Sequence, residues 1–218
     1  MKLDVVEQKN INEMKNLKAQ FHPHFLYNTL DSILHLNDNK KSEDVEKMIV
    51  ALSKFFRSSI STERNIIPLK EEIEHVKSYL LIQKIRYSNR FTYHFEIDES
   101  LMDFQVLKLG LQPIVENAIL HGLNPEKDDN NIIIRTVKDK DFVYVEVENN
   151  GYGITEQDIE KIYKGFLDKK SSKHIGLNNI NQRLQLYYGE QSKVSIISEP
   201  DEYTIVRMAF PINRGESI

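Results

Sequence analysis

Apolar side chains recur every three or four residues through the first quarter of the chain, a spacing typical of amphipathic helices. One stripe consists of Ile11, Met14, Leu17, Phe21 and Phe25. After a polar break at 37–41, a second stripe consists of Val45, Ile49, Leu52, Phe55 and Phe56. Ser42 is placed to cap the second helix, because its hydroxyl can accept a hydrogen bond from a free backbone N–H. The pattern predicts two helices, each with one apolar face.

The remaining pattern mixes helices with strands. A linker is predicted at 62–68, followed by a helix at 69–87 whose first turn is acidic and whose last turn is basic, as the helix dipole favours. Alternating apolar positions predict strands, two of them joined as a hairpin. These strands are 91–97, 132–137, 142–147, 193–198 and 204–210. Further helices are predicted at 108–122, 155–163 and 178–188.

Composition divides the chain in the same way. Residues 1–64 contain no glycine, whereas all eight glycines fall between 110 and 218. We therefore expect an α plus α/β fold, with a helical domain at 1–64 and an α/β domain at 65–218. Two helices alone cannot bury both of their apolar stripes, and a dimeric four-helix bundle would bury them.

Charge and cysteine content narrow the function. The chain has 29 basic and 33 acidic residues, for a net charge of −4, so no basic face for nucleic acid is expected. The absence of cysteine excludes disulfides and thiolate metal sites. No apolar run approaches the ~20 residues of a membrane-spanning helix. Because the sequence starts inside an apparent helix, we expect a fragment whose upstream part is missing; a short protein with a frayed helix is the alternative.

Two glycine clusters are candidates for ligand binding. Residues 149–154 follow a strand and contain Gly-x-Gly, which lets the backbone approach a ligand closely. Residues 174–179 open a helix, where free N–H groups suit phosphate. The polar, lysine-rich stretch 164–173 between them resembles a mobile lid. An ordinary turn, a helix cap and a solvated loop would explain the same three segments.

A third candidate lies in the helix predicted at 108–122. Glu116 and Asn117 interrupt its apolar sequence, and His121 shares a face with Asn117. Polar groups on a buried face need partners, and Mg²⁺ bound to phosphate is one, because magnesium takes one or two protein oxygens. A hydrogen-bonded polar patch in the core is the alternative.

In this order, Asn117 with its neighbours resembles the N-box, 149–154 the G1 box and 174–178 the G2 box of GHKL ATPases. Residues 21–30 (FHPHFLYNTL) resemble the phosphoacceptor segment of LytS/YesM-like sensor histidine kinases, which 79–87 and 111–117 also match. The resemblance spans about 19–211. It implies an N-terminal helical hairpin that forms a dimeric four-helix bundle, followed by a GHKL (Bergerat) α/β sandwich that binds ATP and Mg²⁺.

The resemblance also implies roles for individual residues. Those implied to bind Mg·ATP are Asn117, His121, Asn149, Gly151, Gly153, Gly176 and Leu177. Asn117 would hold Mg²⁺ and His121 would line the phosphates, while Asn149 would face the adenine amine above a floor shaped by the two glycines that follow it. Gly176 and Leu177 would close the triphosphate end. Asn149 stands where the family usually has Asp, so weaker ATP binding is expected. His174 replaces a usual glycine, and Leu120 a frequent lysine.

His24 is the predicted phosphoacceptor, since a neutral imidazole is nucleophilic at neutral pH. Pro23 beside it lacks an N–H and is expected to kink the helix. Asn28 lies one turn later on the same face, so Asn28 or Gln20 is expected to hydrogen-bond the ring and fix its tautomer. His22, on another face, is the rival acceptor.

The predicted enzyme is an ATP:protein-histidine phosphotransferase that passes phosphate to an Asp of a response regulator receiver domain. It would act as a homodimer, as the cytoplasmic portion of a bacterial membrane protein that reaches the membrane only through its missing upstream segment. The alternatives are a GHKL ATPase or protein serine kinase, and a non-catalytic dimeric pseudokinase. A metal hydrolase is not favoured, because no His-Glu-x-x-His spacing occurs.

Overall fold

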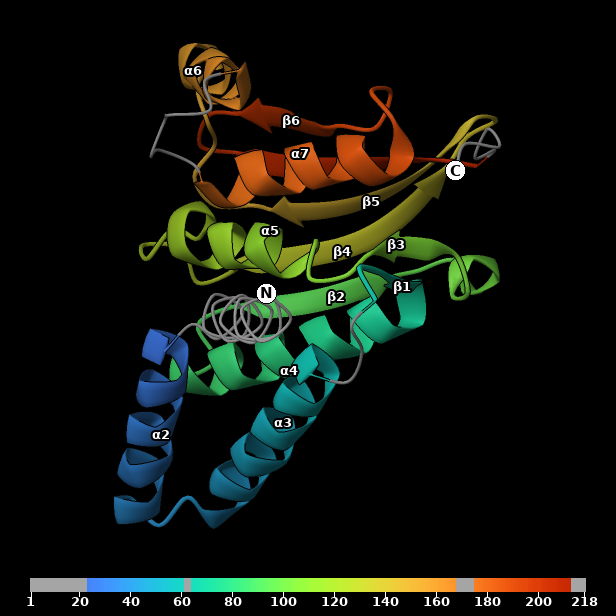
Figure 1. The fold of residues 1–218 in the computed structure, drawn as a ribbon. Coiled ribbons are helices and arrows are strands. Elements are labelled where there is room, and N and C mark those ends of the chain that lie inside the picture. Colours follow the sequence, from blue (N-terminus) through green and yellow to red (C-terminus); the bar gives the residue numbers. More distant parts are fainter. Residues whose placement is uncertain (1–22, 61–63, 168–174, 213–218) are drawn as a thin grey trace, which may run out of the picture.

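The N-terminal part of the structure is a helical hairpin that stands beside an α/β layer (Figure 1). The computed structural model describes residues 23–60, 64–167 and 175–212. Helix α2 (Pro23–Asp38) and helix α3 (Ser42–Ile60) meet at a tight turn, where Lys40 has a φ of 58°. The predicted break between the two helices is confirmed. The predictions for Ile11 to Phe21, Gln20 and His22, and the upstream side of the Pro23 kink, lie outside the described residues.

The α/β part contains a five-stranded sheet in the order β2-β4-β5-β7-β6. Its strands are β2 (Thr92–Glu96), β4 (Asn131–Lys138), β5 (Phe142–Asn149), β6 (Val194–Glu199) and β7 (Tyr203–Pro211). Strand β2 pairs with β4 in parallel and the other neighbours are antiparallel, which confirms the predicted hairpin, formed by β4 and β5. Helices α5 (Gln112–Asn117) and α7 (Ile175–Tyr188) lie across one face of the sheet, and α6 (Glu156–Leu167) lies at its β6 edge (Figure 1). The predicted fold class, helices followed by an α/β layer, is confirmed.

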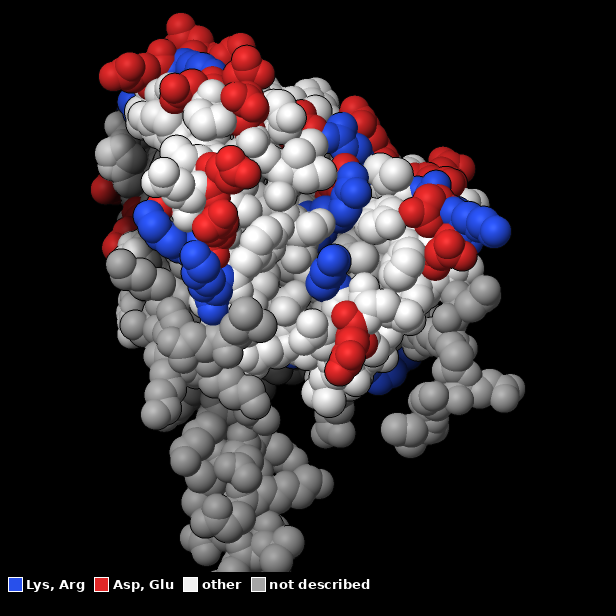
Figure 2. Space-filling view, turned by 90° about the horizontal axis from the view of Figure 1, so that it is seen from above, with Lys and Arg blue, Asp and Glu red and all other residues white. Residues whose placement is uncertain are grey.

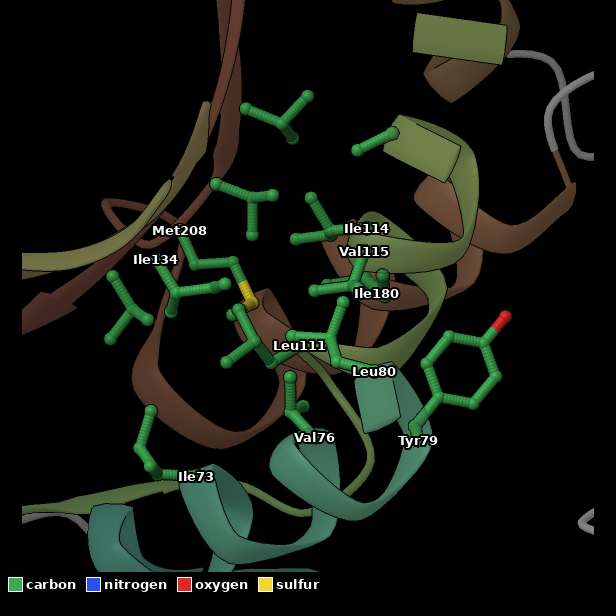
Figure 3. Packing of buried hydrophobic residues seen from close by; sticks show 14 of the residues in the cluster. Ile73, Val76, Tyr79, Leu80, Leu111, Ile114, Val115, Ile134, Ile180 and Met208 are labelled. Carbon is green, nitrogen blue, oxygen red and sulfur yellow. The ribbon is translucent and has the colours of Figure 1, made fainter. Parts of the chain in front are cut away.

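Helix α4 (Leu69–Arg86) is buried on two sides. Ile73, Val76 and Leu80 point into the core shared with α5, α7 and the sheet, whereas Tyr79 points away from it (Figure 3). On that second side the Tyr79 ring lies 5.3 Å from the Phe25 ring of α2. The hairpin and the sheet therefore share one continuous core through α4, which accounts for the burial of Tyr79 at 1% exposure.

Two predictions about local structure are wrong. Part of the predicted linker 62–68 is a strand, β1 (Ile66–Pro68), which pairs with β3 (Gln105–Leu107). The helix predicted at 108–122 begins only at Gln112, because Leu109 has a φ of 54°, which no α-helix accommodates. Its last turn, Ala118–Gly122, is a π-helix.

Charged side chains of both signs are mixed over the face seen in Figure 2. On the sheet, Glu146 is only 2% exposed, yet its carboxylate is paired on both sides. Arg135 Nε donates to it at 2.9 Å from β4 and Arg207 Nε at 2.6 Å from β7. The Glu146 carboxylate on β5 is thus paired with an arginine from each neighbouring strand, and these two charged hydrogen bonds offset the free-energy cost of burying it.

Candidate active site

A cavity of about 740 Å³ opens between α5, α6, the start of α7 and the sheet. It brings together most of the residues that the sequence assigned to nucleotide binding: Asn117, His121, Asn149, Gly176 and Leu177. Its other walls are apolar side chains from strands and helices, with a few polar ones. These are Ile114, Ala118, Gly122, Val147, Tyr152, Ile154, Asp158, Lys161, Ile162, Ile196, Thr204 and Val206. Such a mixture of apolar walls and few polar groups is typical of small-molecule sites.

The π-turn at Ala118–Gly122 shapes one wall of the cavity. Asn117 ends α5, and His121 follows inside the wider turn, so both side chains line the cavity although the helix is not regular between them. Single π-turns within helices often mark functional sites. The sequence does not reveal this turn, because the spacing of apolar residues does not distinguish a π-turn from an α-turn.

The carbonyl oxygen of Gly122 ties this turn to the end of strand β5. It accepts hydrogen bonds from Asn149 Nδ2 at 2.9 Å and from the backbone N–H of Tyr152 at 2.8 Å. A Cβ atom on Gly122 would overlap the Asn149 amide, and one on Gly151 would overlap the Gly122 carbonyl oxygen. The glycines at 122 and 151 are therefore required for the two segments to meet.

Gly153 has the same role on the other side of the loop. A Cβ atom on it would overlap the backbone of Glu199 at the β6–β7 turn. Next to it, the Ile154 N–H donates to Ser198 Oγ at 2.8 Å. Neither Gly151 nor Gly153 is among the residues that line the cavity. Their role is to let the loop after β5 pack closely against Gly122 and Glu199.

Asn149 is 3% exposed, and its amide has two ends with different surroundings. Because Nδ2 donates to Gly122, the side-chain oxygen is turned away from that carbonyl and remains available as an acceptor. An Asp at this position could not donate to Gly122 and would place a carboxylate against a carbonyl oxygen. The amide at 149 thus stabilises the wall of the cavity as well as facing its interior.

We expect Asn149→Asp to destabilise the nucleotide-free protein by about 1–3 kcal/mol, the cost of an unmade buried hydrogen bond. Thermal unfolding without nucleotide measures this change. Asn150→Asp is the matched control, because Asn150 Nδ2 donates to the exposed backbone of Asp129 and its neighbourhood is wetter. Equal stability of the parent and Asn149→Asp would contradict the expectation.

Two residues of α6 at the mouth of the cavity were not anticipated from the sequence. Lys161 Nζ lies 2.7 Å from Asp158 Oδ1, and both side chains are mostly exposed. Hydrogen bonds from Lys161 and Thr155 hold the pKa of Asp158 below its usual range. Asp158 and Lys161 are three residues apart on a polar helix, a spacing that is common on solvent-exposed helices and does not by itself indicate a binding site. His174 and the lysine-rich stretch at 168–173 lie outside the described residues.

His24 lies at the start of α2 and is exposed to solvent. Asn28 Nδ2 lies 3.0 Å from its Nδ1 and 3.1 Å from its Nε2, so the amide lies within hydrogen-bonding distance of the ring. That this contact fixes the tautomer stays a prediction. The neighbouring Phe25 is buried, with its ring 5.0 Å from Phe55 of α3. Since adjacent helical residues project about 100° apart, anchoring Phe25 turns His24 outward.

Comparison with known proteins places these features in a family. Residues 12–91 match the model of the histidine kinase family, and residues 103–214 match that of the histidine kinase-, DNA gyrase B- and HSP90-like ATPases. The chain belongs to the histidine kinase family. It is 35% identical over 199 residues to the sensor histidine kinase YesM of Bacillus subtilis, covering 91% of this chain and 33% of that protein.

Two further relatives are also named as sensor proteins. The chain is 35% identical to the sensor protein LytS of Staphylococcus saprophyticus, over 86% of this chain and 32% of that protein. It is 30% identical to the sensor protein kinase HptS of Staphylococcus aureus, over 93% of this chain and 39% of that protein. This histidine kinase chain thus spans about a third of the length of the curated relatives that it matches.

Solved structures share the fold. The catalytic domain of histidine kinase ThkA superimposes with a TM-score of 0.51 at 23% identity, over 69% of this chain and 96% of that one. The Acinetobacter baumannii histidine kinase AdeS superimposes with a TM-score of 0.50 at 11% identity, over 83% of this chain and 85% of that one. Membership of the histidine kinase family, together with the match to its ATPase model, implies that this chain binds ATP.

The donor set of the cavity fits Mg²⁺ held through nucleotide phosphates rather than by a protein cage. In the described ranges no group of three or more His, Cys, Asp or Glu side chains could hold a metal ion. Asn117 supplies one side-chain oxygen at the cavity wall, and magnesium characteristically combines one or two protein oxygens with phosphate oxygens and water.

Within the same described residues, no helix is long and apolar enough to span a membrane.

Proposed function

We propose that this chain transfers the γ-phosphoryl group of Mg·ATP to its own His24 and then to an Asp of a response regulator receiver domain. The observation that carries the proposal is the pairing of two features on one continuous core: an exposed histidine at the start of α2, and a cavity lined by Asn117 and Asn149. Phosphoryl transfer needs positioning and charge neutralisation more than covalent help from the protein, and both features supply positioning.

In the proposed reaction a ring nitrogen of His24 attacks the γ-phosphorus. The N–P bond forms as the bond between the γ-phosphorus and the β,γ-bridging oxygen breaks, and ADP leaves with that oxygen. Mg²⁺, when bound, neutralises charge on the phosphates. Asn28 orients the ring, Asn117 contributes the protein oxygen at the phosphates, and Asn149 accepts from the adenine amine.

The roles of the remaining candidates follow from their positions. His121, Gly176 and Leu177 line the cavity beside Asn117 and would surround the triphosphate. Gly151 and Gly153 would support the adenine end through the loop that they allow to pack. These assignments make one half of the cavity an adenine site and the other half a phosphate site.

The hairpin is proposed to dimerise. Several large apolar side chains of α2 and α3 remain exposed in the single chain: Tyr27, Leu30, Leu34, Ile49 and Val50. Tyr27, Leu30 and Leu34 follow helical spacing and form one stripe. A second hairpin packed on this stripe would complete a four-helix bundle.

Incubation of the chain with γ-labelled ATP and Mg²⁺ tests the proposal. Label that is acid-labile and alkali-stable on the protein is expected, as for a phosphohistidine. Free labelled phosphate without phosphoprotein would instead indicate an ATPase. A dimer that binds no ATP would indicate a non-catalytic signalling module.

A further inference from the structure

His75 is a buried histidine that the proposed chemistry does not use. It lies in the middle of α4, is 2% exposed, and stacks on the Phe55 ring with centroids 4.5 Å apart. Its Nε2 donates to Gln112 Oε1 at 2.8 Å, and its Nδ1 is hydrogen-bonded to Ser58 Oγ at 2.7 Å. One side chain therefore joins three helices: α3, α4 and α5.

The two ends of this chain of hydrogen bonds lead to the two halves of the proposed reaction. Ser58 belongs to the last turn of α3, and α3 packs against α2, the helix that carries the exposed His24. Gln112 is the first residue of α5, the short helix that ends at Asn117 in the cavity wall. A buried imidazole with two satisfied nitrogens fixes distance and orientation at both ends, since each lost bond would leave a buried polar group unpaired.

Neighbouring contacts hold the same junction. The Glu72 carboxylate, one turn before His75, accepts from the N–H groups of Leu109 and Leu111 at 2.9 and 2.8 Å. Burial raises the pKa of Glu72. These bonds hold Leu109 in its left-handed conformation, which costs free energy unless the surroundings enforce it.

Lys108 closes the junction from the other side. Its Nζ donates to the carbonyl oxygen of Ser59 at 2.9 Å, and its own carbonyl oxygen accepts from Arg183 of α7 at 2.8 Å. The segment before α5 is thus clamped between the hairpin and the helix that carries Gly176. The clamp is polar, whereas most of the surrounding interface is apolar.

We propose that His75 is a positioning residue for phosphoryl transfer, which sets the hairpin bearing His24 relative to the helix bearing Asn117 through Ser58 and Gln112. This role rests on the proposed function. It goes beyond it by assigning the alignment of acceptor and nucleotide to a site that contacts neither. A residue with this role affects the transfer step more than it affects nucleotide binding.

The test compares His75→Phe, Gln112→Leu and the double variant with the parent. Phenylalanine keeps the ring against Phe55 and removes both hydrogen bonds. The rate of His24 labelling at saturating ATP is expected to fall by about 10- to 100-fold in each variant, as for a misplacement of about 1 Å. The dissociation constant for ATP is expected to remain within about threefold, and the double variant to be no slower than His75→Phe. His94→Phe, on the exposed side of β2, is the control.

Rates within twofold of the parent in all three variants would overturn the proposal, and so would a loss of ATP affinity that matches the loss of rate. If the parent itself acquires no label, the proposed function fails, and hydrogen exchange decides the role of His75 separately. His75→Phe is then expected to speed exchange at 55–60 and 112–117 together, with α6 unchanged. Unaltered exchange at 112–117 would refute the link.

Discussion

Replacement of His24 by alanine is expected to remove acid-labile label from the protein completely, while ATP binding is unchanged. The reason is chemical, because alanine offers no nitrogen lone pair to the γ-phosphorus. The His24 side chain is exposed and its only described partner is the half-buried Asn28, so the fold should tolerate the change. Phosphoprotein assays and calorimetric ATP titration on the same preparations measure the two effects.

The structure supplies a matched control on the same helix. His35 is also exposed and also contacts an asparagine four residues later, with Asn39 Nδ2 3.2 Å from its Nε2. His35→Ala should label like the parent. Asn28→Ala should label about tenfold more slowly, because the ring of His24 then rotates freely. Persistent label on His24→Ala would identify another acceptor, with His22 as the first to examine.

Gly151→Ala is expected to destroy the nucleotide site. Its Cβ atom would overlap the carbonyl oxygen of Gly122, which is backbone and cannot rotate away. Relief requires the β5 loop to separate from the π-turn, breaking the bonds to Asn149 and Tyr152. We expect a loss of about 3 kcal/mol in the free energy of unfolding, the upper end for overpacking, and no measurable ATP binding.

Gly176→Ala is the corresponding control, because both glycines belong to motifs that the sequence assigns to nucleotide binding. The atom nearest to a Cβ at 176 is Pro113 Cβ at 3.7 Å, an ordinary contact. Since alanine favours the first turn of α7, the free energy of unfolding should be equal or higher. Parent-like unfolding of Gly151→Ala would show that the loop can repack.

The sheet could be predicted because apolar residues recur at alternate positions in most of its strands. Ile132 and Ile134 are both fully buried, as their period of two requires. Five of the cavity residues were assigned through motifs, whereas the apolar wall formed by Ile196 and Val206 was not, because both lie in predicted strands that carry no motif. The local pattern of apolar residues is thus sufficient to predict a strand where the alternation continues over several residues.

The start of α5 shows where sequence reasoning stops. Residues 108–111 look helical, yet two N–H groups there bind Glu72, which is distant in sequence. The short strands β1 and β3 span three residues each, too few to show a period. The predicted boundary between 64 and 65 stays a prediction. In each case a contact between remote segments decides the local structure.

The double burial of α4 limits how such kinases can be recombined. A chimera joined at the 64/65 boundary would pair a foreign hairpin with the native α4, and foreign side chains would meet Tyr79 and His75 in place of Phe25, Phe55 and Ser58. A junction placed after Arg86 would transplant that interface intact and would leave the mismatch on the sheet-facing side, at Ile73, Val76 and Leu80. The choice of fusion point therefore decides which of the two interfaces must be redesigned.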